Sequence, residues 1–417
     1  AAAPVAPYAA KRRALVAEHF AGKVVIVAAG SMKQRSNDTD YRFRAHSGFT
    51  HLTGWGSATV PDSVLVLDTR HSTATIYLRE TAGRDSEEFF ANPAIGEFWL
   101  GARPTLQQVS ALLDIDTKSL SEYDDYRAGL HDSDVVTLEN DSLIEFLSEL
   151  RFVKDAYEIA EMRKAVAASI KGFEEVVRTL PKATGHARGE RIVEGAFFSQ
   201  ARVEGNDLGY ETIAAAGSHA CTLHWIVNDG PVRDGELLLL DAGVEVDSLY
   251  TADITRTLPI NGKYTDVQRK VYEAVRKAAD AVFAVAKPGL KFRDLHAEAM
   301  KVIAATVSEW GLIDISAEES LKPENQLHRR WMVHGTSHHL GLDVHDCAQA
   351  RRELYLDQEL KPGMVFTIEP GLYFQPDDLL VPEELRGIGV RIEDDVVVTE
   401  NGIECLTSFP RELRLVG

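Results

Sequence analysis

Acidic residues at the ends of two apolar segments are the first candidates for chemistry. Asp241 ends the run Leu237 to Leu240, and Asp253 precedes Ile-Thr-Arg-Thr. A hairpin that turns at their midpoint, residue 247, sets the two carboxylates directly opposite each other, with Cβ atoms about 4.5–5.5 Å apart. One of them then protonates unless a cation lies between them, and the spacing suits a pair of metal ions about 3.5–4 Å apart. The alternative is a solvent-facing pair at a sheet edge.

Two further acids lie in apolar strand patterns. Glu369 follows the stretch 364–368, and Pro370 then ends the strand. Glu393 lies within the stretch 389–398, which is rich in β-branched residues. Because an unpaired buried carboxylate is costly, each acid needs a partner. A metal ion is one candidate, and an ion pair with Arg391 is the alternative for Glu393.

Histidines cluster at His334, His338, His339 and His345. Two glycines in this segment argue against a helix, and in an extended chain His334 and His338 share a face. Imidazole is a ligand for Zn, Mn, Fe and Co, so the cluster is a candidate metal site; a polar loop is the alternative. His224, beside a tryptophan, is more typical of a packed, hydrogen-bonded residue than of a catalyst.

The elements that must position these residues fall into two groups. Before residue 150, helical and strand patterns alternate, which predicts an α/β domain over 1–150. Asp155 and Glu158 form a helix N-cap and N3 pair, so we place the boundary near Arg151. Over 151–417, helices and strand pairs are grouped, which predicts an α+β domain. We expect helices over 8–20, 105–113, 142–150, 155–179, 188–205, 265–286 and 292–310, and strands over 24–28, 64–67 and 75–78.

Composition narrows the class of protein. The 417 residues carry a formal net charge of −19, and such an acidic surface disfavours nucleic-acid and membrane partners. The sequence has 3 cysteines and no CxxC pair. So few cysteines indicate a reducing, cytoplasmic compartment, and they exclude a disulfide framework and a thiolate zinc site. We expect no signal peptide and no membrane helix. The GxGxxG, Walker A, GxSxG and HExxH patterns are absent from the sequence.

Five motifs follow one another along the chain: LLLLDAG, TADITRT, HGTSHHLGLDVHD, TIEPGLYF and GIGVRIEDD. In order and approximate spacing they resemble the metallopeptidases of the pita-bread fold, most closely the aminopeptidase P (Xaa-Pro aminopeptidase) family. The lead-in RSND, YRFR and FTHLTG, between residues 35 and 54, resembles that family's N-terminal domain. The resemblance covers nearly the whole chain. It implies a creatinase/prolidase-like N-terminal α/β domain and an α+β pita-bread catalytic domain.

Carried over position by position, the resemblance implies two divalent ions held by Asp241, Asp253, His338, Glu369 and Glu393. Asp253 and Glu393 would bridge the ions, Asp241 would chelate one of them, and His338 and Glu369 would complete the other. The charges then balance, because four carboxylates carry −4 and two ions carry +4. Oxygen-rich ligands with one imidazole favour Mn(II), although Co(II) or Zn(II) also fit.

The resemblance also implies roles in catalysis. A hydroxide bridging the two ions would be the nucleophile, and Glu369 would carry its proton to the departing nitrogen. The family's outer histidines, which contact substrate and stabilise the tetrahedral intermediate, match His224, His334 and His345. The supporting positions around the site match Tyr373 and Arg391.

The remaining positions concern the walls of the site. Asp38 and Trp99 resemble N-terminal-domain residues that approach a neighbouring subunit's active site in oligomeric relatives, which favours a homodimer or homotetramer. His339 stands where close relatives often have an aromatic residue, so we expect it to alter the wall around the leaving-group pocket.

The function implied is release of the first residue from peptides whose second residue is proline, a bond whose nitrogen carries no hydrogen. Prolidase, which cleaves only Xaa-Pro dipeptides, shares the same ligand set and stays an alternative. A metal-free pita-bread protein, either an amidinohydrolase or a binding module, is a second alternative. That class typically replaces the ligand positions, which all hold suitable residues here.

Overall fold

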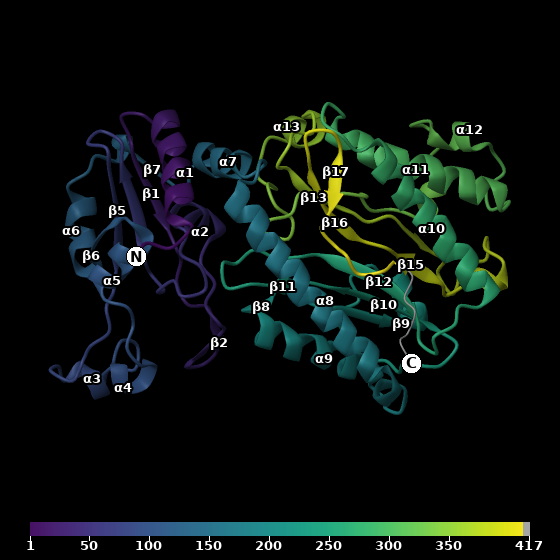
Figure 1. The fold of residues 1–417 in the computed structure, drawn as a ribbon, viewed down its shortest axis with the longest axis horizontal. Helices are drawn as coiled ribbons and strands as arrows, with labels where there is room; N and C mark the ends of the chain where they lie inside the picture. Colours follow the sequence, from purple (N-terminus) through teal and green to yellow (C-terminus); the bar gives the residue numbers. More distant parts are fainter. Residues whose placement is uncertain (412–417) are drawn as a thin grey trace. The chain divides into compact units, whose positions relative to one another are not determined.

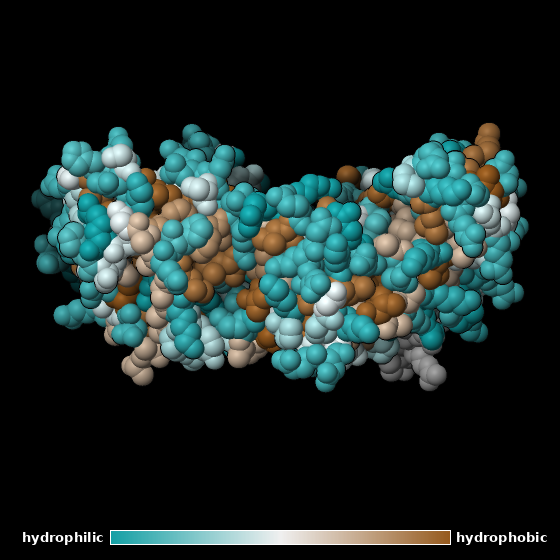
Figure 2. All heavy atoms as spheres, turned by 90° about the horizontal axis from the view of Figure 1, so that it is seen from above, coloured by the Kyte–Doolittle hydropathy of each residue, from teal (hydrophilic) through white to brown (hydrophobic). Residues whose placement is uncertain are grey.

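The computed structural model describes residues 1–411, which fold into two compact units (Figure 1). Unit 1 comprises residues 1–150 with the short segment 247–249, and unit 2 comprises the other described residues, 151–246 and 250–411. Each unit has its own hydrophobic core. Hydrophilic side chains cover most of the face shown in Figure 2, and hydrophobic ones gather in small patches. Among the described helices, none is long and apolar enough to cross a bilayer.

Unit 1 is a mixed five-stranded sheet with the order β6-β5-β4-β1-β7, in which β1 runs antiparallel to β4 and parallel to β7. Alternate residues of β1 face opposite sides of the sheet, with Val25 and Val27 in one apolar cluster and Val24 and Ile26 in another. The strands are β1 (Val24–Ala28), β2 (Gln34–Ser36), β3 (Thr39–Asp40), β4 (Val64–Asp68), β5 (Thr73–Leu78), β6 (Asp116–Ser119) and β7 (Val135–Thr137).

The helices of unit 1 include those that the sequence predicts at its two ends and before β6. They are α1 (Ala6–His19), α2 (Ser47–Thr53), α3 (Glu88–Ala91), α4 (Glu97–Leu100), α5 (Leu106–Leu113), α6 (Tyr123–Ala128) and α7 (Asp141–Leu150). The short α3 and α4 have no buried residues. They therefore lack the apolar periodicity by which a helix is recognised from sequence.

Unit 2 consists of two similar halves, each with a pair of long helices and a small antiparallel sheet. In the first half, α8 and α9 lie side by side and accompany the sheet β12-β10-β9 (Figure 1). In the second, α10 and α11 accompany the sheet β13-β16-β17. The two sheets meet where Thr255 forms a β-bridge with Glu393. This grouping confirms the α+β prediction.

Unit 2 contains six α-helices and ten strands among its described residues. Its helices are α8 (Ala156–Thr184), α9 (Gly189–Glu204), α10 (Asp266–Val285), α11 (Phe292–Glu309), α12 (Ala317–Leu321) and α13 (Arg352–Asp357). Its strands are β8 (Asp207–Leu208), β9 (Ile213–Ala216), β10 (Leu237–Ala242), β11 (Val244–Glu245), β12 (Ile254–Pro259), β13 (Val365–Ile368), β14 (Gly371–Tyr373), β15 (Gly389–Arg391), β16 (Asp394–Val398) and β17 (Ile403–Cys405).

Helix α8 shows how local sequence sets an element of unit 2. The Asp155 side chain accepts from the Glu158 N–H, and the Glu158 side chain accepts from the Asp155 N–H, so the predicted capping box is present. A Cβ at Gly172 would lie 2.5 Å from the Phe197 ring, so glycine permits the close approach of α9. The helix ends at Thr184 rather than at 179, because it continues past Pro181; the predicted end was wrong.

Candidate metal centre

The five predicted metal ligands converge in unit 2, where its two sheets meet. Asp241 lies in β10, Asp253 directly precedes β12, Glu369 follows β13, and Glu393 lies between β15 and β16. His338 lies in an extended segment beside β13, since Thr367 donates its N–H to the His338 carbonyl. All five side chains line one cavity of about 550 Å³.

The register of β10 and β12 differs from the predicted hairpin. Asp241 pairs with Thr255, and Ala242 pairs with Ile254, so Asp241 and Asp253 are diagonal rather than directly opposite. The prediction was wrong because the hairpin turns midway between Glu245 and Thr251, one residue beyond the midpoint of the two acids. The register of β10 and β12 continues through the Glu245–Thr251 bridge and the hydrogen bond from the Val246 N–H to the Tyr250 carbonyl. An offset of two residues keeps both side chains on one face, within reach of each other.

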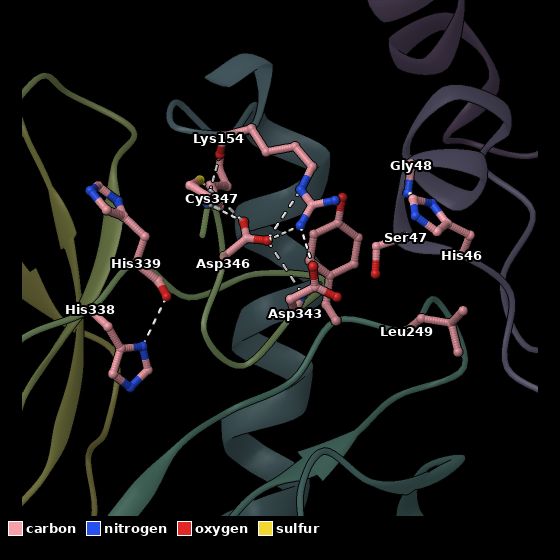
Figure 3. A network of polar contacts seen from close by, with 12 residues as sticks. His46, Ser47, Gly48, Lys154, Leu249, His338, His339, Asp343, Asp346 and Cys347 are labelled. Carbon is pink, nitrogen blue, oxygen red and sulfur yellow. Dashed lines mark hydrogen bonds and ion pairs between the residues drawn. The ribbon is translucent and has the colours of Figure 1, made fainter. Parts of the chain in front are cut away.

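One nitrogen of His338 faces three carboxylates. Its Nε2 lies 3.1 Å from Asp253 Oδ2, 3.3 Å from Glu369 Oε1 and 3.8 Å from Glu393 Oε2. Its Nδ1 donates to the backbone carbonyl of His339 at 2.9 Å, which fixes the orientation of the ring (Figure 3). Asp253, His338 and Glu393 each offer one ligand atom within 4.8 Å of the others. This is the arrangement expected of side chains that share a cation.

Tyr210 is a site residue that sequence reasoning missed. Its hydroxyl lies 2.6 Å from Asp241 Oδ1 and 2.7 Å from Asp253 Oδ1. A hydroxyl has one proton, so it donates to one carboxylate at a time and leaves the repulsion between them only partly relieved. No sequence pattern singles out Tyr210. Its role follows from its position between β8 and β9 and from the pairing of β9 with β10, which places it beside Asp241.

Burial and mutual repulsion shift the pKa values of the clustered carboxyls and of His338. Burial raises the pKa of Glu369 to about 7, against the opposing charge of His338. Burial and the charge of Asp253 raise the pKa of Asp241, and raise that of Glu393 well above its usual range. Although burial opposes both changes, the contact between Asp253 and His338 lowers the pKa of Asp253 to about 2 and raises that of His338 to about 9.

These residues fit divalent cations. The buried Glu393 Oε2 has no hydrogen-bond partner among the described residues, although a buried carboxylate oxygen without one is costly. The pKa values of Glu369 and Glu393 are raised because burial and the neighbouring carboxylates disfavour their negative charges, which a cation among them would compensate. Four carboxylates and one imidazole form an oxygen-rich donor set with one nitrogen, which suits Mn(II), Co(II) or Zn(II).

Arg391 and Tyr373 form a second layer around this cluster. Arg391 donates from Nη2 to Asp241 Oδ2 at 2.8 Å and from Nη1 to the Tyr373 hydroxyl at 3.0 Å. The guanidinium of Arg391 forms its ion pair with Asp241 rather than with Glu393, on which its charge acts only from a distance. The Tyr373 hydroxyl lies 2.7 Å from His334 Nε2, whose other nitrogen lies 2.8 Å from the Gly335 carbonyl. Burial lowers the pKa of His334 to about 4, so the ring is neutral at neutral pH.

The other two candidate catalytic histidines face the same cavity. The His345 ring lies 4.4 Å from the His338 ring in an edge-on arrangement, and burial lowers its pKa. His224 lines the cavity from the loop between β9 and β10, beside Leu223 and Ile226. The cavity therefore combines the charged cluster with histidines and an apolar wall.

Four predicted site residues do not line this cavity: Tyr373, which lies behind Arg391 and His334, and three others. Asp38 lies between β2 and β3 in unit 1 and is exposed. Trp99 lies in α4 of unit 1, with 55% of its surface exposed and its indole N–H donating to the Phe90 carbonyl at 2.8 Å. His339 is buried against Phe292, with ring centroids 4.5 Å apart. Successive side chains of an extended segment point to opposite sides. His339 therefore faces the core, and the cavity lining gives no support for its predicted role in the leaving-group pocket.

A buried ion cluster anchors the loop that carries His345. Asp346 accepts from Lys154 Nζ at 2.9 Å and from Arg151 Nε at 3.1 Å, and all three side chains are buried. The backbone N–H of Asp346 donates to the His339 carbonyl at 2.9 Å, the same carbonyl that orients the His338 ring (Figure 3). The cluster thus supports the backbone around the candidate metal ligand.

Comparisons with known proteins agree with this geometry. The sequence model of metallopeptidase family M24 matches residues 160–400, and that of the aminopeptidase P N-terminal domain matches residues 8–136. The chain is 49% identical to Xaa-Pro aminopeptidase 1 of Streptomyces coelicolor over 422 residues, covering 96% of this chain and 84% of the relative.

Solved structures give the same result. The aminopeptidase PepP of Pseudomonas aeruginosa has a TM-score of 0.82 at 28% identity, covering 98% of this chain and 96% of its own. A Zn-substituted Escherichia coli aminopeptidase P in complex with product has a TM-score of 0.80 at 29% identity, covering 96% and 94%. The predicted fold class, an α/β N-terminal domain and an α+β pita-bread catalytic domain, is confirmed.

Proposed function

The chain belongs to metallopeptidase family M24 and carries the aminopeptidase P N-terminal domain, and we propose that it releases the first residue from peptides whose second residue is proline. It is a metallo-exopeptidase of the Xaa-Pro aminopeptidase type. The observation that carries the proposal is the convergence of the five candidate ligands on one cavity, with a buried Glu393 oxygen that no described residue satisfies.

We assign Asp241, Asp253, His338, Glu369 and Glu393 as the side chains that would hold two divalent ions, with Asp253 and Glu393 as the central carboxylates. The central position of Asp253 supports this assignment, because its carboxylate contacts both Tyr210 and His338. Mn(II) fits the donor set best, and Co(II) or Zn(II) are alternatives. When bound, such ions supply Lewis acidity and a water acidic enough to attack near neutral pH.

Glu369 is the side chain that we assign to proton transfer. Its carboxylate lines the cavity beside His338, and the Thr367 hydroxyl lies 3.3 Å from its Oε1. The departing proline nitrogen carries no hydrogen before cleavage and must receive one. Glu369 takes up, on a carboxylate oxygen, the proton that the attacking water loses and donates it to that nitrogen as the C–N bond breaks.

The three candidate catalytic histidines differ in whether their ring nitrogens already have hydrogen-bond partners. Both nitrogens of His334 are already engaged, by Gly335 and Tyr373. The neutral ring therefore carries its proton on Nδ1 and accepts from the Tyr373 hydroxyl at Nε2. His224 has no hydrogen-bond partner among the described residues, and it faces the cavity. We therefore assign direct contact with the substrate carbonyl to His224 and His345. His334 is bound to Tyr373 and would contact substrate only after that hydrogen bond breaks.

A peptide panel tests the proposal. Protein reconstituted with Mn(II) is given Xaa-Pro-Xaa tripeptides, the matching Xaa-Pro dipeptides and Xaa-Ala-Xaa controls, and the free first residue is quantified. We expect release from the proline tripeptides and little from the alanine controls. Hydrolysis of dipeptides alone would make the protein a prolidase. Activity that EDTA leaves unchanged would favour the metal-free class.

The roles of Asp38 and Trp99 and the homodimer or homotetramer stay predictions. Light scattering on the purified protein tests the oligomer. Substitution of each residue, assayed with tripeptides, tests the two roles: an unchanged kcat and KM in both variants would contradict them.

A further inference from the structure

The loop between β9 and β10, residues 217–236, supplies one wall of the candidate active site. Leu223, His224 and Ile226 from its first part line the cavity. The His224 side chain is exposed and has no hydrogen-bond partner among the described residues. Its position is therefore set by the backbone of the loop, and not by contacts of its own.

The Glu190 carboxylate makes the largest set of contacts with this part of the loop, beside Asn228, which donates to the Thr212 carbonyl, and Arg191, which donates to the Val227 carbonyl. Glu190 lies in the first turn of α9 and is 0% exposed. Four groups of the loop region contact its two oxygens: Ala216 N at 2.8 Å, Gly230 N at 2.6 Å, Trp225 Nε1 at 3.2 Å and His219 Nδ1 at 2.9 Å. A carboxylate that is removed from water this completely requires such donors.

These contacts hold the chain on both sides of the cavity-facing part of the loop. Ala216 ends β9, just before the loop, and Gly230 lies after its cavity-facing part. The Glu190 N–H also donates to the Gly230 carbonyl at 3.0 Å, so Gly230 is held through both of its backbone groups. A Cβ at Gly230 would lie 2.5 Å from His219 Cε1 and 2.7 Å from Glu190 Oε1. Only glycine allows this approach.

The other two contacts lie inside the loop and next to His224. The His219 ring stacks on the Trp225 ring, with centroids 3.9 Å apart and planes at 24°. Trp225 directly follows His224, so fixing the indole through Glu190 also fixes the peptide that carries the imidazole. One buried side chain outside the cavity thus holds the peptide next to a cavity-facing side chain.

We propose that Glu190 is a positioning residue for His224, which it holds at the cavity through Trp225 and through the backbone on both sides of the cavity-facing part, at Ala216 and Gly230. The proposal rests on the proposed function, in which His224 contacts the scissile carbonyl. Glu190 itself touches neither substrate nor the candidate metal ligands. Its loss is therefore expected to lower kcat while metal binding is unchanged.

Glu190→Gln is the most direct test. A carboxylate accepts at both oxygens, whereas an amide accepts at one oxygen and directs N–H groups from the other side towards N–H donors. The substitution therefore breaks contacts without changing side-chain size. We expect kcat for an Xaa-Pro-Xaa tripeptide to fall about 10- to 100-fold, as for a misplaced catalytic group. The Kd for Mn(II) is expected to stay within twofold. Glu204→Gln is the matched control, since Glu204 is on the same helix but pairs with Lys171 on the surface.

A double-mutant cycle separates positioning from general destabilisation. In the His224→Ala background, Glu190→Gln is expected to cause little further loss of kcat, because the side chain that it positions is gone. An equal fold-loss in both backgrounds, or no loss in the single variant, would overturn the proposal. Trp225→Phe keeps an aromatic ring but removes the indole N–H donor, and it replaces Glu190→Gln in the cycle if that variant does not fold. It is expected to give a smaller loss of kcat, again absent in the His224→Ala background.

Hydrogen exchange gives a readout that does not depend on activity. We expect faster exchange of amides 217–230 in Glu190→Gln and unchanged exchange in β10 and β12. Unchanged exchange over 217–230 would contradict the clamp whether or not the protein cleaves proline peptides. If the wild type cleaves none, the proposed function fails, and the exchange data still decide the role of Glu190 in the loop.

Discussion

Removing the charge of Asp346 tests whether the ion cluster stabilises unit 2 and its candidate metal ligand. Asp346 is 1% exposed, and its partner Lys154 is 3% exposed. Breaking one side of a buried ion pair typically costs about 3–5 kcal/mol, because the other charge stays buried without compensation. In Asp346→Asn, Arg151 keeps its contact with Asp343 at 2.5 Å, so Lys154 is the charge left unpaired. We therefore expect the lower end of this range, about 3 kcal/mol.

Urea unfolding of the metal-free protein, followed by tryptophan fluorescence, measures this loss. The matched control is Asp132→Asn. Asp132 pairs with Arg127 at 2.8 Å, but its side chain is 92% exposed, and such surface pairs contribute about 0–1 kcal/mol. A loss below about 1 kcal/mol in Asp346→Asn, equal to that in the control, would refute the reasoning.

The same variant carries a pH signature. Burial alone would raise the pKa of Asp346, but the charges of Arg151 and Lys154 hold it well below its usual range. A group whose pKa is lowered on folding stabilises the fold above its unfolded pKa, about 3.9 for aspartate, and that stability is lost as the pH falls below this value. The difference in unfolding free energy between wild type and Asp346→Asn is therefore constant above about pH 5 and shrinks below about pH 4. A difference that grows on acidification would contradict the assignment.

Three further predictions concern the site itself. Glu369→Ala is expected to lower kcat by about 100- to 10,000-fold and to weaken metal binding, because it removes both a ligand and the proton donor; isothermal titration with Mn(II) and a tripeptide assay check this, and normal metal affinity would contradict the ligand role. His224→Ala is expected to lower kcat by about 100- to 1,000-fold with metal content intact; elemental analysis decides, and loss of the metals would show that its role is wrong. Chelation by EDTA is expected to lower Tm, and added Mn(II) to raise it with concentration, because the ions bind only the folded cluster; a Tm that is independent of Mn(II) would contradict metal binding there.

The candidate site was visible in the sequence because acids inside apolar strands are rare without a partner. Asp241, Asp253 and Glu393 attract attention for that reason, and the structure brings them into one cavity. Tyr210 was not visible, because a tyrosine beside a strand is ordinary, and its function depends on β9 pairing with β10.

The rest depended on tertiary structure that no local pattern encodes. The register of β10 and β12 could not be derived from the midpoint of two acids, because the acids are not a directly opposed pair and the hairpin turns one residue further along, midway between Glu245 and Thr251. Glu190 looks like a surface acid of an amphipathic helix, and only the folded loop shows that it is buried. The helices with capping boxes, such as α8 and α10, were predictable because their start signals are local.

Metal stoichiometry measured together with activity tests the central claim most directly. Protein stripped with EDTA is titrated with Mn(II) while bound metal per chain and hydrolysis of an Xaa-Pro-Xaa tripeptide are measured in the same samples. We predict that two Mn(II) ions bind per chain and that hydrolysis appears as they bind. Full hydrolysis by the stripped protein, or saturation of binding without any hydrolysis, would contradict the account.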